Sequence, residues 1–245
     1  MSRLIEYLAG FFDGEGSIGL YKNKRCIQIR VGQVREEPLK LYVSVFGGKV
    51  YFSQITKGGL PYYQYNTTDS LRCGKILSSL YPYLIVKQEK AQAALELLGR
   101  PVPTSLQNVS LEYLAGFFDA EGSISIANMS SVNVCVTQVD KTVLLLFQQC
   151  FGGNIYHKGS GVYGWSLRSK ELQEFCNSLI PYAVVQKDRL ILLKRFQLID
   201  LRVVRYKTEE LKEALTQEKF KLAVQIAALN LMKDKRIEVS DMFAD

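Results

Sequence analysis

Each copy of a ten-residue repeat in this chain carries, near its end, acids that have the chemistry to bind a metal ion. The segment LAGFFDGEGS occupies residues 8–17, and LAGFFDAEGS occupies residues 114–123. A repeat of this kind predicts a duplicated structural unit. If the apolar part of each copy is a helix, Glu15 and Glu121 stand at helix C-termini, where the macrodipole disfavours negative charge.

The small residues of the repeat indicate how two such helices would meet. The Ala-Gly pairs at 9–10 and 115–116 leave one side of each helix nearly free of side-chain bulk. Because glycine inside a helix costs about 1 kcal/mol relative to alanine, a close backbone approach is the expected reason for it. We expect the helices to pack along a pseudo-twofold axis, with Glu15 beside Glu121. Two carboxylates placed side by side repel each other and need a cation between them. Hard divalent ions such as Mg²⁺ bind carboxylate, water and phosphate oxygens.

The composition excludes several kinds of enzyme. His157 is the only histidine among 245 residues, so nucleases with a histidine base, two-His zinc sites and Ser-His-Asp triads are excluded. Five widely spaced cysteines indicate reduced thiols rather than a zinc site or a disulfide framework. The 31 Lys and Arg residues outnumber the 24 Asp and Glu residues, which suits a polyanionic partner. Without a long apolar run or a signal peptide, we expect a soluble, intracellular protein that does not contact membranes.

Two halves repeat one plan beyond the decapeptide. Residues 27–51 correspond to residues 132–156, and residues 80–90 correspond to residues 179–189. Apolar and polar residues alternate at the start of the first pair of segments, which predicts strands with one buried and one open face. Each half is expected to contain, in order, a helix, two strands, a helix, two strands and a helix. This order predicts an α+β fold. Besides the repeat, helices are expected at 38–46, 70–81, 87–98, 141–151, 170–179 and 186–201, and further strands at 49–53, 62–67, 154–158 and 162–167.

We expect four segments along the chain. They are a first half at 1–98, a linker at 99–109, a second half at 110–202 and a C-terminal extension at 203–245. The linker holds two prolines and shows no periodicity, and Ser110 is expected to cap the helix that follows it. In the extension, helical patterns are expected at 208–219 and again within 221–236.

The two decapeptides resemble the signature of the LAGLIDADG homing endonucleases, in their monomeric, two-repeat form. This resemblance implies two pseudo-symmetric αββαββα half-domains whose antiparallel strands form a saddle over the DNA major groove. It also implies a hydrolase that takes part in intron homing. Such an enzyme makes a double-strand break in a long, asymmetric DNA target and depends on divalent metal ions. Mg²⁺ is the expected cofactor, with Mn²⁺ as a substitute, and Ca²⁺ is expected to support binding without cleavage.

The resemblance assigns residues to the reaction. The metal site that it implies comprises Glu15, Glu121, Gly14 and Ala120. Both acids are Glu where the family more often has Asp, which shifts the placement of the metal. Gln33 and Gln138 stand in the family's V-x-Q context, where a polar residue orders water in the active site.

A lysine is implied in at least one half. Lys87, five residues after Pro82, matches a family lysine that stabilises the scissile phosphate or tunes the attacking water. In the second half the same spacing from Pro181 gives Gln186, with Lys187 one step further on. Lys87 and Lys187 are therefore the candidate catalytic cations, and whether Gln186 or Lys187 serves the second site stays open.

The open face of each predicted sheet would contact DNA. Arg30 can pair with guanine and Gln28 with adenine in the major groove. In the first half the residues expected on this face are Lys24, Cys26, Gln28, Arg30, Tyr51, Ser53, Gln64 and Asn66. In the second half they are Ser131, Asn133, Cys135, Tyr156, Lys158, Ser166 and Arg168. Because equivalent positions differ between the halves, an asymmetric target is expected.

The C-terminal tail carries a further resemblance, and two other functions stay open for the chain. The segment QIAALN at 225–230 resembles the C-terminal helix of homodimeric members found in chloroplast introns, which implies phosphate contacts from Lys233 and Arg236. That likeness favours an organellar intron, in a chloroplast or mitochondrion. An intron RNA maturase with the same fold, and a DNA-binding regulator with an inactive site, stay open as alternatives.

Overall fold

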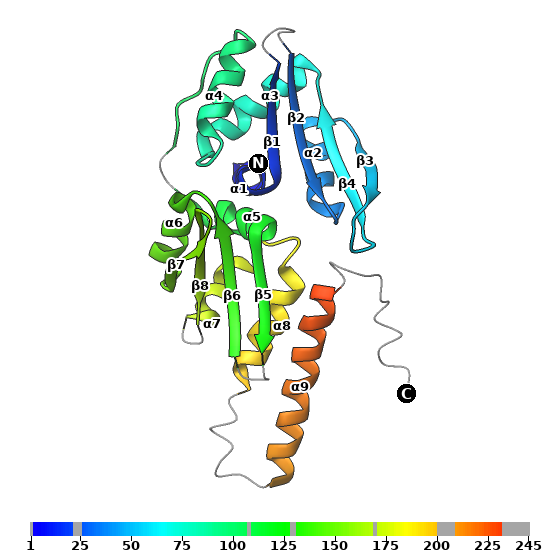
Figure 1. Ribbon diagram of the computed structural model, residues 1–245, viewed down its shortest axis with the longest axis vertical. Coiled ribbons are helices and arrows are strands. Elements are labelled where there is room, and N and C mark those ends of the chain that lie inside the picture. The colour runs from blue at the N-terminus through cyan, green and yellow to red at the C-terminus, as the bar shows by residue number, and fades with distance from the viewer. Residues whose placement is uncertain are drawn as a thin grey trace.

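The protein has two similar halves that meet at a pair of helices (Figure 1). A computed structural model describes residues 2–21, 26–106, 109–127, 131–168, 171–199 and 209–231. This part of the chain contains two four-stranded antiparallel sheets, with helices packed on one side of each. The expected α+β architecture is confirmed.

The first half follows the predicted order of elements and adds a short 3-10 helix. Its elements are α1 (Ser2–Glu15), β1 (Gly16–Tyr21), β2 (Cys26–Gln33), α2 (Glu37–Phe46), β3 (Val50–Ile55), β4 (Pro61–Thr67), α3 (Ser70–Leu80), η2 (Tyr81–Tyr83) and α4 (Gln88–Leu97). The strands lie in the order β1-β2-β4-β3.

The second half repeats this arrangement. Its elements are α5 (Leu111–Glu121), β5 (Gly122–Ala127), β6 (Ser131–Gln138), α6 (Lys141–Phe151), β7 (Asn154–Gly159), β8 (Val162–Leu167), α7 (Leu172–Leu179) and α8 (Lys187–Leu198). The strand order β5-β6-β8-β7 matches that of the first sheet. As expected, the Ser110 side chain caps α5 by accepting a hydrogen bond from the Tyr113 backbone N–H.

Alternation along the second strand of each sheet separates a core face from an open face. Ile27, Ile29 and Val31 on β2 are buried against the helices, whereas Arg30 is exposed. On β6, Val132, Val134 and Val136 are likewise buried. The open face of each sheet is therefore the one on which the sequence places its polar side chains.

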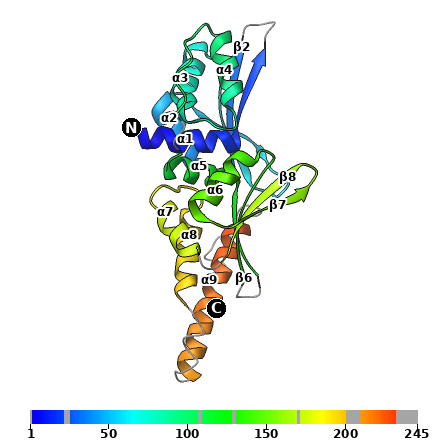
Figure 2. The same ribbon diagram turned by 90° about the vertical axis from the view of Figure 1, so that its left-hand side faces the viewer.

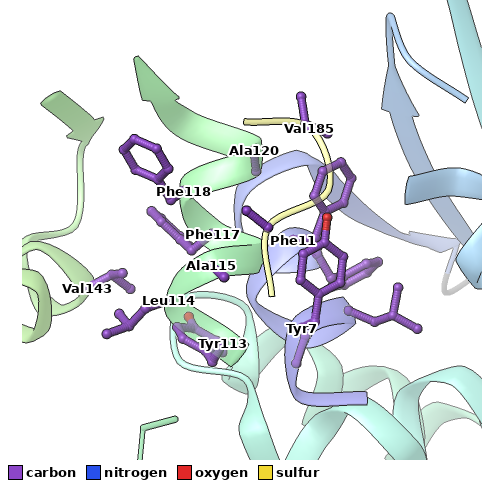
Figure 3. Packing of buried hydrophobic residues seen from close by; sticks show 14 of the residues in the cluster. Tyr7, Phe11, Tyr113, Leu114, Ala115, Phe117, Phe118, Ala120, Val143 and Val185 are labelled. Carbon is purple, nitrogen blue, oxygen red and sulfur yellow. The ribbon is translucent and has the colours of Figure 1, made fainter. Parts of the chain in front are cut away.

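The two halves share one continuous core through α1 and α5. These helices lie side by side between the two sheets (Figure 2). Phe11 and Phe117, from equivalent positions of the repeat, are fully buried at this contact, and Tyr7 and Tyr113 lie beside them (Figure 3). The predicted packing of the two repeat helices is confirmed.

The C-terminal extension differs from the expectation of two consecutive helical segments. Residues Glu209–Leu231 form one continuous helix, α9, because no glycine or proline interrupts this stretch. Leu222 and Ile226 are buried where α9 packs on α8 and on β5. None of the helices in the described ranges is long and apolar enough to cross a membrane.

Candidate active site

The glycines of the repeat bring the backbones of α1 and α5 into direct contact. A Cβ atom added at Gly10 would lie 2.0 Å from the Tyr113 carbonyl oxygen, and one added at Gly116 would lie 2.0 Å from the Tyr7 carbonyl oxygen. No side chain fits at either position. The reciprocal contacts also demonstrate the pseudo-twofold relation between the two helices.

The same approach brings the C-terminal ends of the two helices together. Glu15 is the last residue of α1, and Glu121 is the last residue of α5. At Gly14 an added Cβ would lie 2.4 Å from the Ala120 Cβ and 3.1 Å from the Glu121 Cγ. The Glu121 side chain therefore begins directly beside α1. Two carboxylates at two negative helix ends form a site that favours a cation.

Asp13 and Asp119 hold the helix ends in place rather than facing a ligand. Asp13 is fully buried and accepts hydrogen bonds from the backbone N–H groups of Ile85, Val86 and Lys87 at 2.7, 3.1 and 2.9 Å. Asp119 accepts the equivalent three bonds from Val184, Val185 and Gln186 at 2.6, 2.9 and 2.8 Å. Burial raises the pKa of both carboxyl groups, and these backbone donors oppose that effect.

Each of these buried carboxylates also accepts a hydrogen bond from the opposite half. The Tyr113 hydroxyl donates to Asp13 Oδ2 at 2.7 Å, and the Tyr7 hydroxyl donates to Asp119 Oδ2 at 2.8 Å. Both tyrosines directly precede the leucine of the repeat. These crossed bonds fix the ends of α1 and α5 relative to each other, and with them the separation of the two glutamates.

Removing one of the crossed bonds is expected to destabilise the fold. Tyr113→Phe should lower the free energy of unfolding by about 1.5 to 3 kcal/mol, since a buried carboxylate loses one donor without access to water. Urea denaturation followed by circular dichroism measures this change. Tyr51→Phe, at an exposed tyrosine, is the control and should change the free energy by less than about 0.5 kcal/mol. Equal effects of the two substitutions would contradict the role given to Tyr113.

One of the two predicted glutamines contacts a glutamate of the site. Gln33 is buried, and its Nε2 donates to Glu15 Oε1 at 3.2 Å while its Oε1 accepts from the Val34 backbone N–H at 2.8 Å. In the second half, Gln138 accepts the equivalent bond from the Val139 backbone N–H at 2.8 Å. The backbone bond sets the orientation of both amides, and in the first half it directs the N–H group to Glu15.

Lys87 lies against the end of α1. Its ammonium group donates to the carbonyl oxygens of Asp13 and Gly14. Burial lowers the pKa of Lys87, and the negative charges of Asp13, Glu121 and Glu15 oppose that effect. The ammonium group is thus within electrostatic reach of both glutamates.

In the second half, Gln186 and not Lys187 takes the position of Lys87. The Gln186 backbone N–H donates to Asp119 as that of Lys87 does to Asp13, and its side-chain Nε2 donates to the Gly122 carbonyl oxygen at 2.8 Å. Lys187 is exposed on α8. Of the two residues left open by the sequence, Gln186 is therefore the one that turns inward to the end of α5, because the Asp119 bond fixes its position.

The oxygen donors at the helix ends fit a hard divalent cation. Glu15 and Glu121 supply two carboxylates, and Gly14 and Ala120 precede them where the two helix ends meet. In the described ranges, no group of three or more His, Cys, Asp or Glu side chains has the geometry to hold a metal by itself. A cation such as Mg²⁺, which keeps several waters and binds phosphate, suits a site with few protein ligands.

On the first sheet, the polar residues of the open face are already connected to one another. Arg30 on β2 is paired in register with Asn66 on β4. Gln28 Nε2 donates to Asn66 Oδ1 at 3.1 Å, and Arg30 donates to Gln28 Oε1 at 3.4 Å. Tyr21 on β1, which the sequence analysis did not select, donates to the same Gln28 oxygen at 3.2 Å. These bonds hold the long polar side chains at the surface of the sheet.

The outer strands of the first sheet carry the rest of its predicted set. Cys26 is half-buried at the start of β2. Tyr51 is exposed and pairs in register with Gln64, and Ser53 lies in the irregularity between Phe52 and Gln54. Lys24 lies outside the described residues.

The second sheet is less open than expected. Cys135 pairs in register with Ser166, but it is only 4% exposed because Tyr156 lies over it, with 3.4 Å between the Cys135 Sγ and the tyrosine hydroxyl. The expectation that the Cys135 side chain faces solvent is wrong for this reason. Asn133 is exposed, and Lys158 donates to the Thr137 hydroxyl at 2.7 Å.

The remaining predicted residues divide between described and undescribed parts of the chain. Arg168 is exposed directly after β8. The side chain of Ser131 and the residues Lys233 and Arg236 lie outside the described part of the chain. Among the residues that the sequence analysis missed, Ser17, Gly19 and Tyr21 share the open face with Arg30. Their alternation with Ile18 and Leu20 is the signal that would have found them.

The sequence of the chain is similar to a known protein family and to intron-encoded proteins. Residues 108–179 match the family model of the LAGLIDADG-like domain. The probable intron-encoded endonuclease aI2 of Debaryomyces hansenii is 26% identical over 215 residues, which cover 76% of this chain and 32% of the relative. The intron-encoded RNA maturase bI4 of Saccharomyces cerevisiae is 25% identical over 212 residues, covering 79% of this chain and 32% of the relative. The chain thus spans about a third of the length of these relatives.

Solved structures share the fold across both halves. The LAGLIDADG homing endonuclease I-GzeII in complex with its DNA target is 18% identical, with a TM-score of 0.64 over 91% of this chain and 96% of that protein. I-SmaMI bound to an uncleaved DNA target in the presence of calcium ions is 15% identical, with a TM-score of 0.60 over 91% of this chain and 97% of that protein.

Proposed function

Because the chain carries a LAGLIDADG-like domain and has the two-domain fold of the LAGLIDADG homing endonucleases, we propose that it is a site-specific DNA endonuclease. It cuts both strands of an asymmetric double-stranded target with divalent metal ions as cofactors. The observation that supports this proposal most directly is the contact between α1 and α5, which brings the glutamates of two repeats to one place.

The residues at the helix ends would have different roles in phosphodiester hydrolysis. Glu15 and Glu121 would hold Mg²⁺, which activates water and stabilises the leaving 3′ oxygen when bound. Gln33 orients the Glu15 carboxylate through its amide. Lys87 offsets negative charge on the scissile phosphate, and its partial burial strengthens this interaction relative to one in bulk water.

The two open sheet faces would read the target in the major groove. The first sheet presents Arg30, Gln28 and Asn66 as a connected group, whereas the second presents Asn133, Lys158 and Arg168. Since the two faces carry different donors and acceptors, the two half-sites of the DNA would differ in sequence. One chain supplies both halves, and we therefore propose that it acts as a monomer.

An RNA maturase function is the second candidate. The likeness to a protein named as an intron-encoded RNA maturase favours it, although the two similar relatives carry different functions in their names. Both names point to an intron-encoded protein, and we propose an organellar intron as its source. Splicing of the host intron with and without the protein tests this second function.

Cleavage of the intronless junction tests the first function. A duplex that spans the host sequence without its intron is expected to be cut on both strands in Mg²⁺. Replacing Mg²⁺ by EDTA should slow cutting by more than about 100-fold, because the metal carries the charge stabilisation. With Ca²⁺ the protein should bind the duplex in a mobility-shift assay without cutting it. Cutting that persists in EDTA, or no cutting in Mg²⁺, would contradict the proposal.

A further inference from the structure

A buried arginine links the second half of the site to the C-terminal helix. Arg189 on α8 is only 2% exposed. Its Nη1 donates to Gln186 Oε1 at 2.7 Å, and its Nη2 donates to the Leu229 carbonyl oxygen near the end of α9. Its Nε has no hydrogen-bond partner in the described part of the protein, where the guanidinium group donates through Nη1 and Nη2.

The first of these contacts fixes a side chain at the helix ends. Gln186 is fully buried, and its amide makes two hydrogen bonds: Oε1 accepts from Arg189, and Nε2 donates to the carbonyl oxygen of Gly122, which directly follows Glu121. An amide can rotate by half a turn at little cost unless its oxygen and nitrogen have distinct partners. Arg189 supplies the partner that sets the orientation of Gln186.

The second contact makes this arrangement depend on α9. The Leu229 carbonyl belongs to α9, so this hydrogen bond joins Arg189 directly to that helix. Next to Leu229, Asn230 Nδ2 donates to the Ile124 carbonyl oxygen of β5 at 2.7 Å. The C-terminal part of α9 is thus hydrogen-bonded both to Arg189 and to β5, the strand that follows Glu121, and Figure 1 shows α9 beside this half of the protein.

The first half has no equivalent of this linkage in the described residues. Lys87 takes the position of Gln186 and contacts the end of α1 by itself. Lys90, which is equivalent to Arg189, is exposed. The two halves therefore differ in how the residue beside the glutamate is held: directly by charge in the first half, and through Arg189 and α9 in the second.

We propose that Arg189 is a positioning residue that orients Gln186, and that docking of α9 thereby controls cleavage by the Glu121 half but not by the Glu15 half. This inference rests on the proposed endonuclease function. It assigns to the C-terminal helix a role in the rate of one strand cut, separate from any contact with DNA.

Strand-resolved cleavage tests the proposal. The full chain is assayed on the intronless-junction duplex in Mg²⁺, with each strand labelled separately, and Lys87→Met identifies the strand that depends on the first half. Arg189→Met should slow cutting of the other strand by about 10- to 100-fold, the usual effect of losing a group that orients an active-site residue. The strand that Lys87→Met slows should change by less than about twofold. Equal slowing of both strands by Arg189→Met would overturn the proposal.

Further variants separate positioning from loss of structure. Arg189→Lys keeps the positive charge and one nitrogen that can donate, and it should cut that strand faster than Arg189→Met does. Asn230→Ala loosens the end of α9 without altering Arg189, and it should slow the same strand. Lys90→Met, at the equivalent exposed position of the first half, is the matched control and should leave both strands unchanged. An Asn230→Ala variant that cuts both strands as the parent does would overturn the role of α9.

Hydrogen–deuterium exchange provides a measurement that does not depend on cleavage. In Arg189→Met, backbone amides at 122–126 and 186–190 should exchange faster, whereas those at 85–90 should not change. Unchanged exchange at 186–190 would overturn the inference even if the DNA is cut. Absence of any cleavage by the unmodified chain would instead contradict the proposed function, so the two failures are distinguishable.

Discussion

Glu121→Gln is expected to lower the rate of DNA cleavage by at least about 10³-fold, which corresponds to about 4 kcal/mol of transition-state stabilisation. The substitution keeps the shape of the side chain and removes its charge. Since Glu15 and Glu121 are the acids that the two helix ends bring together, the site would lose half of its carboxylate charge toward a divalent ion. Cleavage of a labelled duplex in Mg²⁺ measures the effect.

Two measurements show that the lost activity is not lost structure. DNA binding in Ca²⁺ should be retained, because the sheet faces are unchanged. In the absence of metal, the variant should unfold in one cooperative transition as the parent does, because the substitution keeps the shape of the side chain beside Gly14. Glu112→Gln is the matched control, because it makes the same change at the opposite end of α5, where Glu112 pairs with Arg3. Full cleavage by Glu121→Gln would show that the metal site is wrongly assigned.

Gly116→Ala is expected to have the largest effect on stability. The added methyl group would lie 2.0 Å from the Tyr7 carbonyl oxygen and 2.9 Å from the Phe11 nitrogen, both backbone atoms that cannot rotate away. The two helices would have to separate, which disrupts the shared core and both crossed tyrosine bonds. We expect the free energy of unfolding to fall by about 3 kcal/mol or more, a large fraction of the stability of a typical domain. Chemical denaturation measures it.

Gly74→Ala is the matched control for this prediction. Gly74 also lies inside a helix, but an added Cβ there would meet the side chain of Arg100, which can move. Because alanine favours helix over glycine by about 1 kcal/mol, Gly74→Ala should be neutral or stabilising. A Gly116→Ala variant as stable as the parent would contradict the close packing of α1 and α5.

The packing of the central helix pair could be predicted from the sequence because the same decapeptide, with its glycine, occurs in both helices. Glycine at equivalent positions of two helices has few explanations other than close approach, and the structure has that approach at Gly10 and Gly116. The strand faces were predictable for a similar reason, since alternation on β2 and β6 depends only on local spacing.

Contacts between segments that are distant in the sequence could not be predicted from local spacing. The pairing of Arg189 with Leu229 requires knowledge of where α9 packs, and the burial of Cys135 requires the register that brings Tyr156 over it. The choice between Gln186 and Lys187 depended on which backbone N–H meets Asp119. The spacing from Pro181 alone did not contain this information.

The contact between Gly14 and Ala120 has a consequence for how this protein can change over generations. The same few atoms that let the helices touch also determine how far apart the two glutamates begin. A substitution that alters this contact changes folding and catalysis in one step, so neither property can drift without the other. Residues on the open sheet faces carry no such double constraint. For the proposed endonuclease, new DNA targets would therefore be accessible by exchange of strand residues, whereas the helix pair would have to be retained.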